Sequence, residues 1–353
     1  MVGLQVGWAL SVLGSEPCTG VAGRGAVLRT TDGGLDWSIV SPPATAQERL
    51  LRLEALSALQ AVVVAAAPWS TGPASVDVTS NGGSSWTSSV LAGRLPAGTP
   101  VSVDFVGHDG WIMMVSDAAM GEQEAMVYRS SDSGATWHVV ESTLWTGPPV
   151  GRTIALGGLK DGLVFQNGQG GWAGATNNGS GLPELFSSTD GGATWAPQVL
   201  AVPAGVPGGG TATVLPTFFS PTSGALPVFF GYGHAEEMAV YTTQDGGTTW
   251  TAGPLLGMPG AGLTPPVATA AGGDMWVADL STLDFSSDRG QTWTAITPGA
   301  PFGSVRTLDF VDRNRGWALE RRGSGGDALA ITNDGGHTWT TLAPLVTAPR
   351  PAA

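Results

Sequence analysis

The stretch STDGGATW, from Ser188 to Trp195, decides the fold, because its pattern returns along the whole chain. The pattern is Ser or Thr, any residue, Asp or Asn, any residue, Gly, any residue, usually Ser or Thr, and then Trp. Successive copies begin 43 to 58 residues apart, which indicates an array of similar structural units. The seven copies are Thr30–Trp37, Thr79–Trp86, Ser130–Trp137, Ser188–Trp195, Thr243–Trp250, Ser286–Trp293 and Thr332–Trp339.

The residue types in this stretch predict a tight turn that is held by its own side chains. A carboxylate such as that of Asp190 and a hydroxyl such as that of Ser188 can accept backbone N–H groups within a turn. Glycine supplies the positive φ, and the Trp then enters an outer strand and packs between units. We therefore expect structural roles for fourteen residues: Asp32, Asn81, Asp132, Asp190, Asp245, Asp288, Asp334, Trp37, Trp86, Trp137, Trp195, Trp250, Trp293 and Trp339.

A second, weaker pattern precedes many of these turns. It is Gly-Trp followed by small and apolar residues, and alternating strands such as VSVDFVG at 101–107 and RTLDFVD at 306–312 lie before two of its copies. The full unit then reads strand, Gly-Trp strand, strand, turn, strand, which is typical of a propeller blade. The copies are Gly7-Trp8, Gly110-Trp111, Gly171-Trp172 and Gly316-Trp317, with Met275-Trp276 as a degenerate version.

One segment favours a helix locally. Residues Gln47 to Gln60, QERLLRLEALSALQ, have helix-favouring composition and a spacing of leucines that fits a helix. The repeat, however, requires strands here. We give the repeat priority and keep a short inserted helix as the alternative.

The seven motifs resemble the Asp-box, or bacterial neuraminidase repeat, and the full unit most resembles propellers of the photosystem II stability/assembly-factor type. Similar repeats occur in sialidases, xyloglucan-degrading hydrolases and sortilin-type receptors. The resemblance implies an all-β fold, a single seven-bladed β-propeller of four-stranded antiparallel blades with the turns at the periphery. The expected blades are residues 1–43, 44–93, 94–145, 146–203, 204–257, 258–299 and 300–345, with a tail at 346–353.

The first expected blade is short at its beginning. Only Met1–Gln5 precede its Gly-Trp strand, so its innermost strand is expected to be short or missing. The ring is then completed either by Leu342–Ala353 or by residues that precede this chain.

Composition excludes several classes of function. Charged residues make up 12% of the chain and the net charge is −13, which disfavours nucleic acid as a partner. No apolar run is long enough to span a membrane. Cys18 is the only cysteine and the histidines lack metal-ligand spacing, so we expect no disulfide within the chain, no metal and no cofactor. The low charge favours a monomeric secreted or cell-envelope protein, although this chain contains no export signal.

Two enzymatic alternatives were weighed against a structural interpretation. A sialidase needs a tyrosine nucleophile, but Tyr128 and Tyr241 occupy repeat positions and only Tyr232 does not, and the Phe/Tyr-Arg-Ile-Pro motif of that family is absent. Another glycosidase needs two facing carboxylates. Asp104 and Asp309 hold equivalent positions on innermost strands, and we expect them to bond the next strand rather than to catalyse.

The remaining polar clusters are candidates for binding. The only dense basic cluster consists of four arginines, and a second polar cluster lies in the expected connection between two strands of the fifth blade. We predict a non-catalytic scaffold that binds a protein or a glycan, with a glycoside hydrolase that uses carboxylates facing the central channel as the alternative. The candidate binding residues are Arg313, Arg315, Arg321, Arg322, His234, Glu236 and Glu237.

Overall fold

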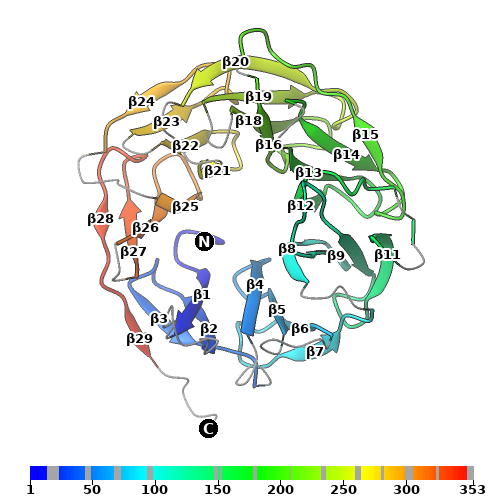
Figure 1. The fold of residues 1–353 in the computed structure, drawn as a ribbon. Helices are drawn as coiled ribbons and strands as arrows, with labels where there is room; N and C mark the ends of the chain where they lie inside the picture. Colours follow the sequence, from blue (N-terminus) through cyan, green and yellow to red (C-terminus); the bar gives the residue numbers. More distant parts are fainter. Residues whose placement is uncertain are drawn as a thin grey trace. The chain divides into compact units, whose positions relative to one another are not determined.

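The computed structural model describes most of the chain, and all structural statements below concern that part (Figure 1). Every regular element in it is a β-strand, and the described residues contain no α-helix. The prediction of an all-β chain is therefore confirmed. The described residues are 1–13, 24–43, 49–66, 73–93, 98–146, 150–151, 153–177, 181–206, 208–231, 236–258, 264–279, 282–298, 305–322 and 326–347.

The chain forms two compact units, which are described separately. The N-terminal unit comprises Val2–Ala173, Phe186–Ala196 and Pro344–Ala353. The C-terminal unit comprises Gly174–Leu185 and Pro197–Ala343, together with Met1.

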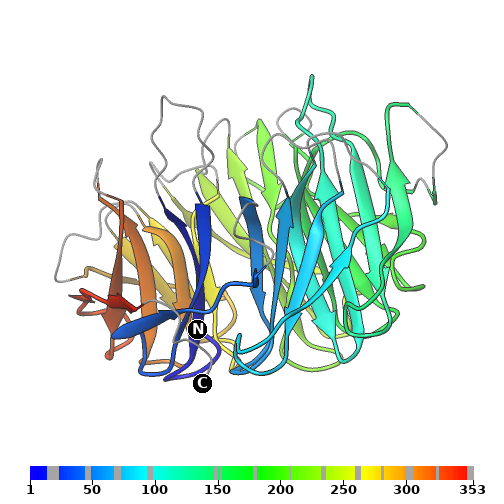
Figure 2. The ribbon, with the colours of Figure 1, turned by 90° about the horizontal axis from the view of Figure 1, so that it is seen from below.

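Three four-stranded sheets lie in the N-terminal unit (Figures 1 and 2). Apart from one parallel pair in the first sheet, neighbouring strands in these sheets are antiparallel. The first sheet contains β1 (Gly7–Leu13), β2 (Arg24–Thr30), β3 (Asp36–Ile39) and β29 (Leu345–Thr347). The second contains β4 (Arg49–Ala55), β5 (Ala61–Ala66), β6 (Ser75–Thr79) and β7 (Thr87–Val90), and the third contains β8 (Thr99–Val106), β9 (Asp109–Val115), β10 (Ala125–Ser130) and β11 (His138–Thr143).

Two further four-stranded antiparallel sheets lie in the C-terminal unit. One contains β21 (Val267–Thr269), β22 (Met275–Asp279), β23 (Thr282–Ser286) and β24 (Thr294–Ile296). The other contains β25 (Val305–Phe310), β26 (Gly316–Arg321), β27 (Asp327–Thr332) and β28 (Thr340–Thr341).

The middle of the chain forms a nine-stranded sheet, from β12 to β20. Strand β16 pairs with β13 at Thr176 and Ala212, and it also pairs with β18. These two pairings join what the repeat predicts as two separate blades. The strands are β12 (Leu159–Phe165), β13 (Gly171–Asn177), β14 (Glu184–Ser188), β15 (Ala196–Gln198), β16 (Gly210–Thr213), β17 (Thr217–Phe218), β18 (Gly224–Gly231), β19 (Glu237–Thr243) and β20 (Thr251–Gly257).

The segment with helical propensity is a strand. Residues Arg49–Ala55 form β4, which pairs antiparallel with β5 from Leu50↔Ala65 to Ala55↔Ala61. The ladder pairs β4 along most of its length, with a register shift between Leu50 and Arg52, and β5 is buried almost throughout. Tertiary pairing therefore overrides the local propensity, as the repeat predicted.

The first sheet is completed by the end of the chain. Strand β29 pairs in parallel with β3, with Val346 opposite Trp37 (Figure 1). Strand β1 is the edge at the other side of this sheet, so no described strand precedes it there. The tail thus supplies the fourth strand of this sheet, at the edge opposite β1.

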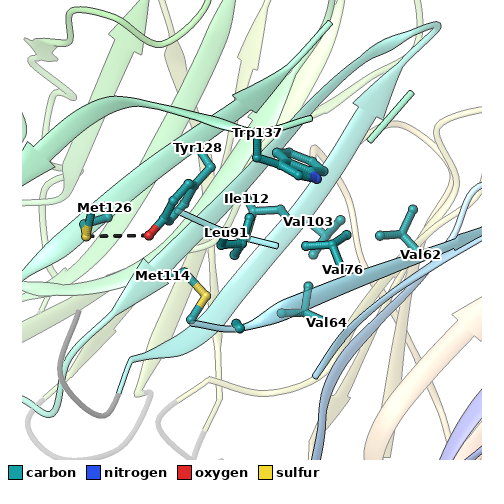
Figure 3. Close-up of a cluster of buried hydrophobic side chains, with 11 residues drawn as sticks. Val62, Val64, Val76, Leu91, Val103, Ile112, Met114, Met126, Tyr128 and Trp137 are labelled. Carbon is teal, nitrogen blue, oxygen red and sulfur yellow. Dashed lines mark hydrogen bonds between the residues drawn. The ribbon is translucent and has the colours of Figure 1, made fainter. Parts of the chain in front are cut away.

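The core of the N-terminal unit lies between neighbouring sheets. Figure 3 shows Val62, Val64 and Val76 from the second sheet beside Ile112 from the third sheet and Trp137, which directly precedes β11. Tyr128 is buried in this cluster, and its hydroxyl donates to the sulfur of Met126 at 3.7 Å. Packing between sheets, rather than within one sheet, therefore stabilises the unit.

Candidate functional site

The seven turns share one set of hydrogen bonds. In the turn from Ser188 to Trp195, the Ser188 hydroxyl donates to Asp190 at 2.9 Å and accepts the N–H of Gly192 at 2.9 Å. Asp190 also accepts the N–H of Thr194 at 2.9 Å. The equivalent three bonds are present in all seven turns, at 2.8–3.0 Å. These acidic side chains are engaged with their own turns.

Five turns carry one additional bond. The hydroxyl of the seventh residue, for example Thr194, donates to the second oxygen of the Asp at 2.6 Å. The first turn lacks this bond because Asp36 replaces the Thr, and in the second turn the Asn81 amide donates to Ser85 at 2.8 Å. The hydroxyl donors favour the ionised carboxylate, so Thr136 and Thr249 lower the pKa of Asp132 and Asp245 to about 2.

Six of the seven turn tryptophans, all except Trp293, have an indole hydrogen bond among the described residues, and these bonds are of two kinds. Four of them donate their indole N–H to the Gly three residues earlier and are buried: Trp37, Trp137, Trp195 and Trp339. Trp86 instead donates to the carbonyl of Val40, and Trp250 donates to the side chain of Gln198. Six of the seven, all except Trp37, immediately precede the fourth strand rather than lying within it.

Two candidate carboxylates bind backbone groups. Asp104 on β8 accepts the N–H of Phe165 on β12 at 2.6 Å. Asp309 on β25 forms an ion pair with the N-terminal amine of Met1. The first contact joins β8 to β12, and the second joins β25 to the start of the chain. Bonding to the next strand is the structural role expected for Asp104 from its repeat position.

Glu54 is an acidic group that sequence reasoning missed. It lies opposite Val62 in the β4–β5 ladder, as Asp104 lies opposite Trp111 and Asp309 opposite Trp317, so the three hold equivalent positions. The sequence does not indicate that Glu54 occupies this position, because QERLLRLEALSALQ fits the spacing of a helix better than that of a strand. Its carboxyl has no hydrogen bond among the described residues.

Glu54 and Asp104 are two buried carboxyl groups of the N-terminal unit, and the charge of Asp104 acts on Glu54. The pKa of Glu54 is raised to about 7, chiefly by burial; the charge of Arg52 opposes this shift and the charge of Asp104 adds to it. Burial also raises the pKa of Asp104 to about 6, against the N–H bond from Phe165. Two neighbouring carboxyl groups that titrate near neutrality can exchange protons with a ligand.

The four candidate arginines do not form one cluster. Arg313 and Arg315 precede β26, whereas Arg321 ends it and Arg322 follows it, and a six-residue strand separates its ends by roughly 17–20 Å. Arg313 makes two bonds with Asp274, at 2.6 and 2.9 Å. Arg315 bonds Asn333 and lies 5.3 Å from the ring centroid of Trp317.

The other end of β26 carries exposed cations. Arg321 and Arg322 are exposed, and Arg322 donates to the Thr341 hydroxyl at 2.8 Å. Arg306, on the neighbouring strand β25, has half of its side chain exposed and lies 3.5 Å from Asp327. We call Arg306, Arg321 and Arg322 the arginine surface; Arg306 was not among the sequence candidates because it stands apart from the other arginines in sequence.

The polar cluster of the nine-stranded sheet is only partly described. Glu237 begins β19, and Glu236 lies just before it in the connection from β18, where its backbone bonds Phe230 and Met258. His234, Tyr232 and Cys18 lie outside the described residues. In the described part of this cluster, two partly buried glutamates, Glu236 and Glu237, lie at the beginning of β19.

The two described tyrosines are buried. The Tyr241 hydroxyl donates to the carbonyl of Ala201 at 2.7 Å, and Tyr128 contacts Met126 as described above. Burial raises the pKa of both phenols to about 12, which opposes formation of a nucleophilic phenolate.

The described residues lack two kinds of feature. They include no group of three or more His, Cys, Asp or Glu side chains arranged to hold a metal ion. They also include no helix with the length and hydropathy that crossing a membrane requires.

Comparison with solved structures identifies the fold. YCF48 bound to a D1 peptide aligns with a TM-score of 0.53 and 16% identity, over 84% of this chain and 81% of that chain. YCF48 from Cyanidioschyzon merolae aligns with a TM-score of 0.51 and 16% identity, over 84% and 85%. The fold matches that of the assembly-factor propeller YCF48.

The same fold also occurs in an enzyme. A prolyl endopeptidase aligns with a TM-score of 0.56 and 11% identity, over 98% of this chain and 49% of that chain. No model of a known protein family matches the chain, and no curated protein matches its sequence. Since propellers serve unrelated functions, the match with YCF48 establishes the fold and leaves function to the site.

Proposed function

We propose that this chain is a non-catalytic β-propeller scaffold that binds an acidic segment of a protein partner. The arginine surface supports this proposal, because it gathers three exposed cations in a chain of net charge −13. Arginine side chains recognise carboxylates through paired hydrogen bonds. A YCF48 propeller carries a bound peptide, so the fold is compatible with this role.

The scaffold in this proposal has seven blades. The seven turns define them, and the nine-stranded sheet then corresponds to the fourth and fifth blades joined through β13 and β16. The first blade takes β29 as its outer strand. We further propose that the protein works as a monomer in the cell envelope or outside the cell, where a low charge and a single lysine are common.

Affinity capture tests the proposed function. The immobilised protein is exposed to an envelope and secreted extract of its source, then eluted with salt and afterwards with mixed oligosaccharides. We expect salt to release one protein, and the variant Arg321→Gln with Arg322→Gln to lose it. The charge-matched control is Val199→Glu with Val202→Glu, at two exposed residues of another connection. Elution by sugar alone would replace the protein partner with a glycan.

Glycoside hydrolysis is the second candidate function, and the buried carboxyls of Glu54 and Asp104 favour it. A glycosidase needs two carboxyl groups, one of which is protonated to act as the acid, and burial raises the pKa of both Glu54 and Asp104. Against it, Asp104 and Asp309 are both bonded to backbone amines or amides. Shortened oligosaccharides in the flow-through, absent with Glu54→Gln, would establish hydrolysis and overturn the non-catalytic proposal.

A further inference from the structure

The same aromatic contact occurs at two places. At each, a Trp on the second strand of one blade-like group stacks on a Phe of the first strand of the next group: β9 against β12, and β22 against β25. In the N-terminal unit Trp111 stacks on Phe165, with ring centroids 3.8 Å apart and planes 9° apart, and its indole N–H donates to the Gly191 carbonyl at 2.9 Å. In the C-terminal unit Trp276 stacks on Phe310 at 3.9 Å and 2°, and donates to the Gly335 carbonyl at 3.1 Å. The repeat thus contains an indole site with a stacking face and an acceptor.

The second and third sheets contain the same site without its indole. Val62 pairs with the residue just before the turn, as Trp111 and Trp276 do, so Val62 holds the tryptophan position. Phe105 corresponds to Phe165 and Phe310, because each phenyl ring lies equally close to the Gly that directly precedes the Trp of the next strand.

The acceptor of this site is also present and unused. Ser133 is the fourth residue of its turn, as Gly191 and Gly335 are of theirs. Among the described residues, Ser133 bonds only His108, through its N–H at 2.9 Å and its hydroxyl at 2.7 Å. Its carbonyl is therefore available to a donor from outside.

An open cavity of about 540 Å³ occupies this place. Its walls include Phe105, Ser133 and Val78, the cross-strand partner of Val62, together with Leu56, Gln60 and His108. His108 and Ser133 are exposed, so the cavity opens to solvent beside the acceptor. Val62 itself is fully buried and does not line the cavity. The valine is shorter than tryptophan by a whole ring system, and among the described residues Phe105 has an edge contact with Trp137 where Phe165 and Phe310 carry a stacked indole.

We propose that this cavity binds the side chain of a tryptophan presented by a partner polypeptide. The indole stacks on Phe105 and donates its N–H to the Ser133 carbonyl, which reproduces the contacts of Trp111 and Trp276. This site lies in the N-terminal unit and does not depend on the arginine surface, so either proposal can fail alone.

N-acetyl-tryptophanamide is the probe, because it carries a peptide group on each side of the residue. Saturation-transfer NMR and calorimetry measure its binding to the whole protein. We expect millimolar affinity or better, weaker by about fivefold when benzothiophene replaces the indole and the N–H is lost. No binding at about 10 mM, equal binding of both probes, or binding of free indole alone would overturn the proposal.

A variant that supplies its own indole is the sharper test. Val62→Trp is expected to direct an indole toward Phe105 and to weaken probe binding by at least about tenfold. Val199→Trp adds an indole at a residue that is 97% exposed and should bind the probe as the native protein does. If Val62→Trp does not fold, Phe105→Leu removes the stacking face and should weaken binding likewise. Native affinity in a folded variant of either kind would overturn the proposal.

Discussion

Trp276 lies flat against Phe310, with 3.9 Å between the ring centroids and 2° between the ring planes. Phe310 in turn meets the turn tryptophan Trp339 edge to face, at 6.0 Å and 86°. Trp111, Phe165 and Trp195 make the same series of contacts in the N-terminal unit. One phenyl ring thus connects a strand of the preceding sheet to the turn of its own sheet.

Removal of the Phe310 ring should lower the stability of the folded protein. We expect Phe310→Ala to lower the free energy of unfolding by about 3–5 kcal/mol, because both aromatic contacts and the buried area are lost. Denaturant unfolding measures the change. The control Val199→Ala alters a residue that is 97% exposed and should stay within about 0.5 kcal/mol of the native protein. A similar small change for Phe310→Ala would contradict the role of the stack.

The turn aspartates should make the protein sensitive to acid. The folded pKa of Asp132 and Asp245 is about 2, below the ordinary value of 3.8. Their contribution to stability is therefore complete above pH 3.8 and is lost as the pH falls toward 2. We expect the double variant Asp132→Asn with Asp245→Asn to lose less stability across this range than the native protein, since Asn81 shows that an amide fits the turn.

Melting temperatures at closely spaced pH values between 4 and 2 would measure this effect. Asp117→Asn changes an exposed aspartate outside the turns and serves as the control. Identical acid profiles for the double variant and the native protein would refute the prediction.

The carboxyl groups of Glu54 and Asp104 should make the protein less stable as the pH rises, the reverse of the effect of the turn aspartates. Both folded pKa values are raised, to about 7 and about 6, so the folded protein binds more protons than the unfolded chain between the ordinary and raised values. For Glu54 the stability gained by protonation is complete below pH 4.5 and is lost as the pH rises through 7.

Glu54→Gln should remove this loss. We expect the variant to be more stable than the native protein above pH 7, by on the order of 1–3 kcal/mol, and nearly equal to it near pH 4.5. Thermal unfolding at both pH values measures the difference, and Glu122→Gln is a control at an exposed acidic residue. A constant difference at both pH values would show that Glu54 acts by packing rather than by titration.

The parallel pairing of β29 with β3 should contribute to stability. A chain that ends at Ala343 lacks β29 and exposes the edge of β3, so we expect a lower melting temperature and more aggregation. A chain that ends at Thr347 keeps β29 and is the matched control. Light scattering and thermal melts compare the two chains. Equal behaviour of both would mean that the tail strand is dispensable.

The seven turns could be predicted from the sequence because each is complete within eight residues. The hydroxyl, carboxylate, glycine and indole that bond one another are all local, so their spacing alone specifies the bonds. The all-β architecture followed from repeating that unit, and it overcame the helical propensity of Arg49–Ala55.

Part of the candidate site depended on contacts between residues far apart in the chain. Glu54 and Asp104 are 50 residues apart, and the charge of Asp104 reaches Glu54 because β4 and β8 of two different sheets lie close together, which no local pattern reveals. Arg313 and Arg321 are close in sequence but lie at opposite ends of β26, since an extended strand separates its ends widely.

The sequence by itself determined the local turns and the repeated strand units, because short-range hydrogen bonds and chain geometry suffice for them. Only the tertiary structure decided which side chains became neighbours: Phe105 beside Ser133 and His108 in the wall of one cavity, β29 beside β3, and the arginine surface at one end of β26. Those contacts depend on the pairing and packing of strands distant in sequence, where burial rather than local spacing sets the energy.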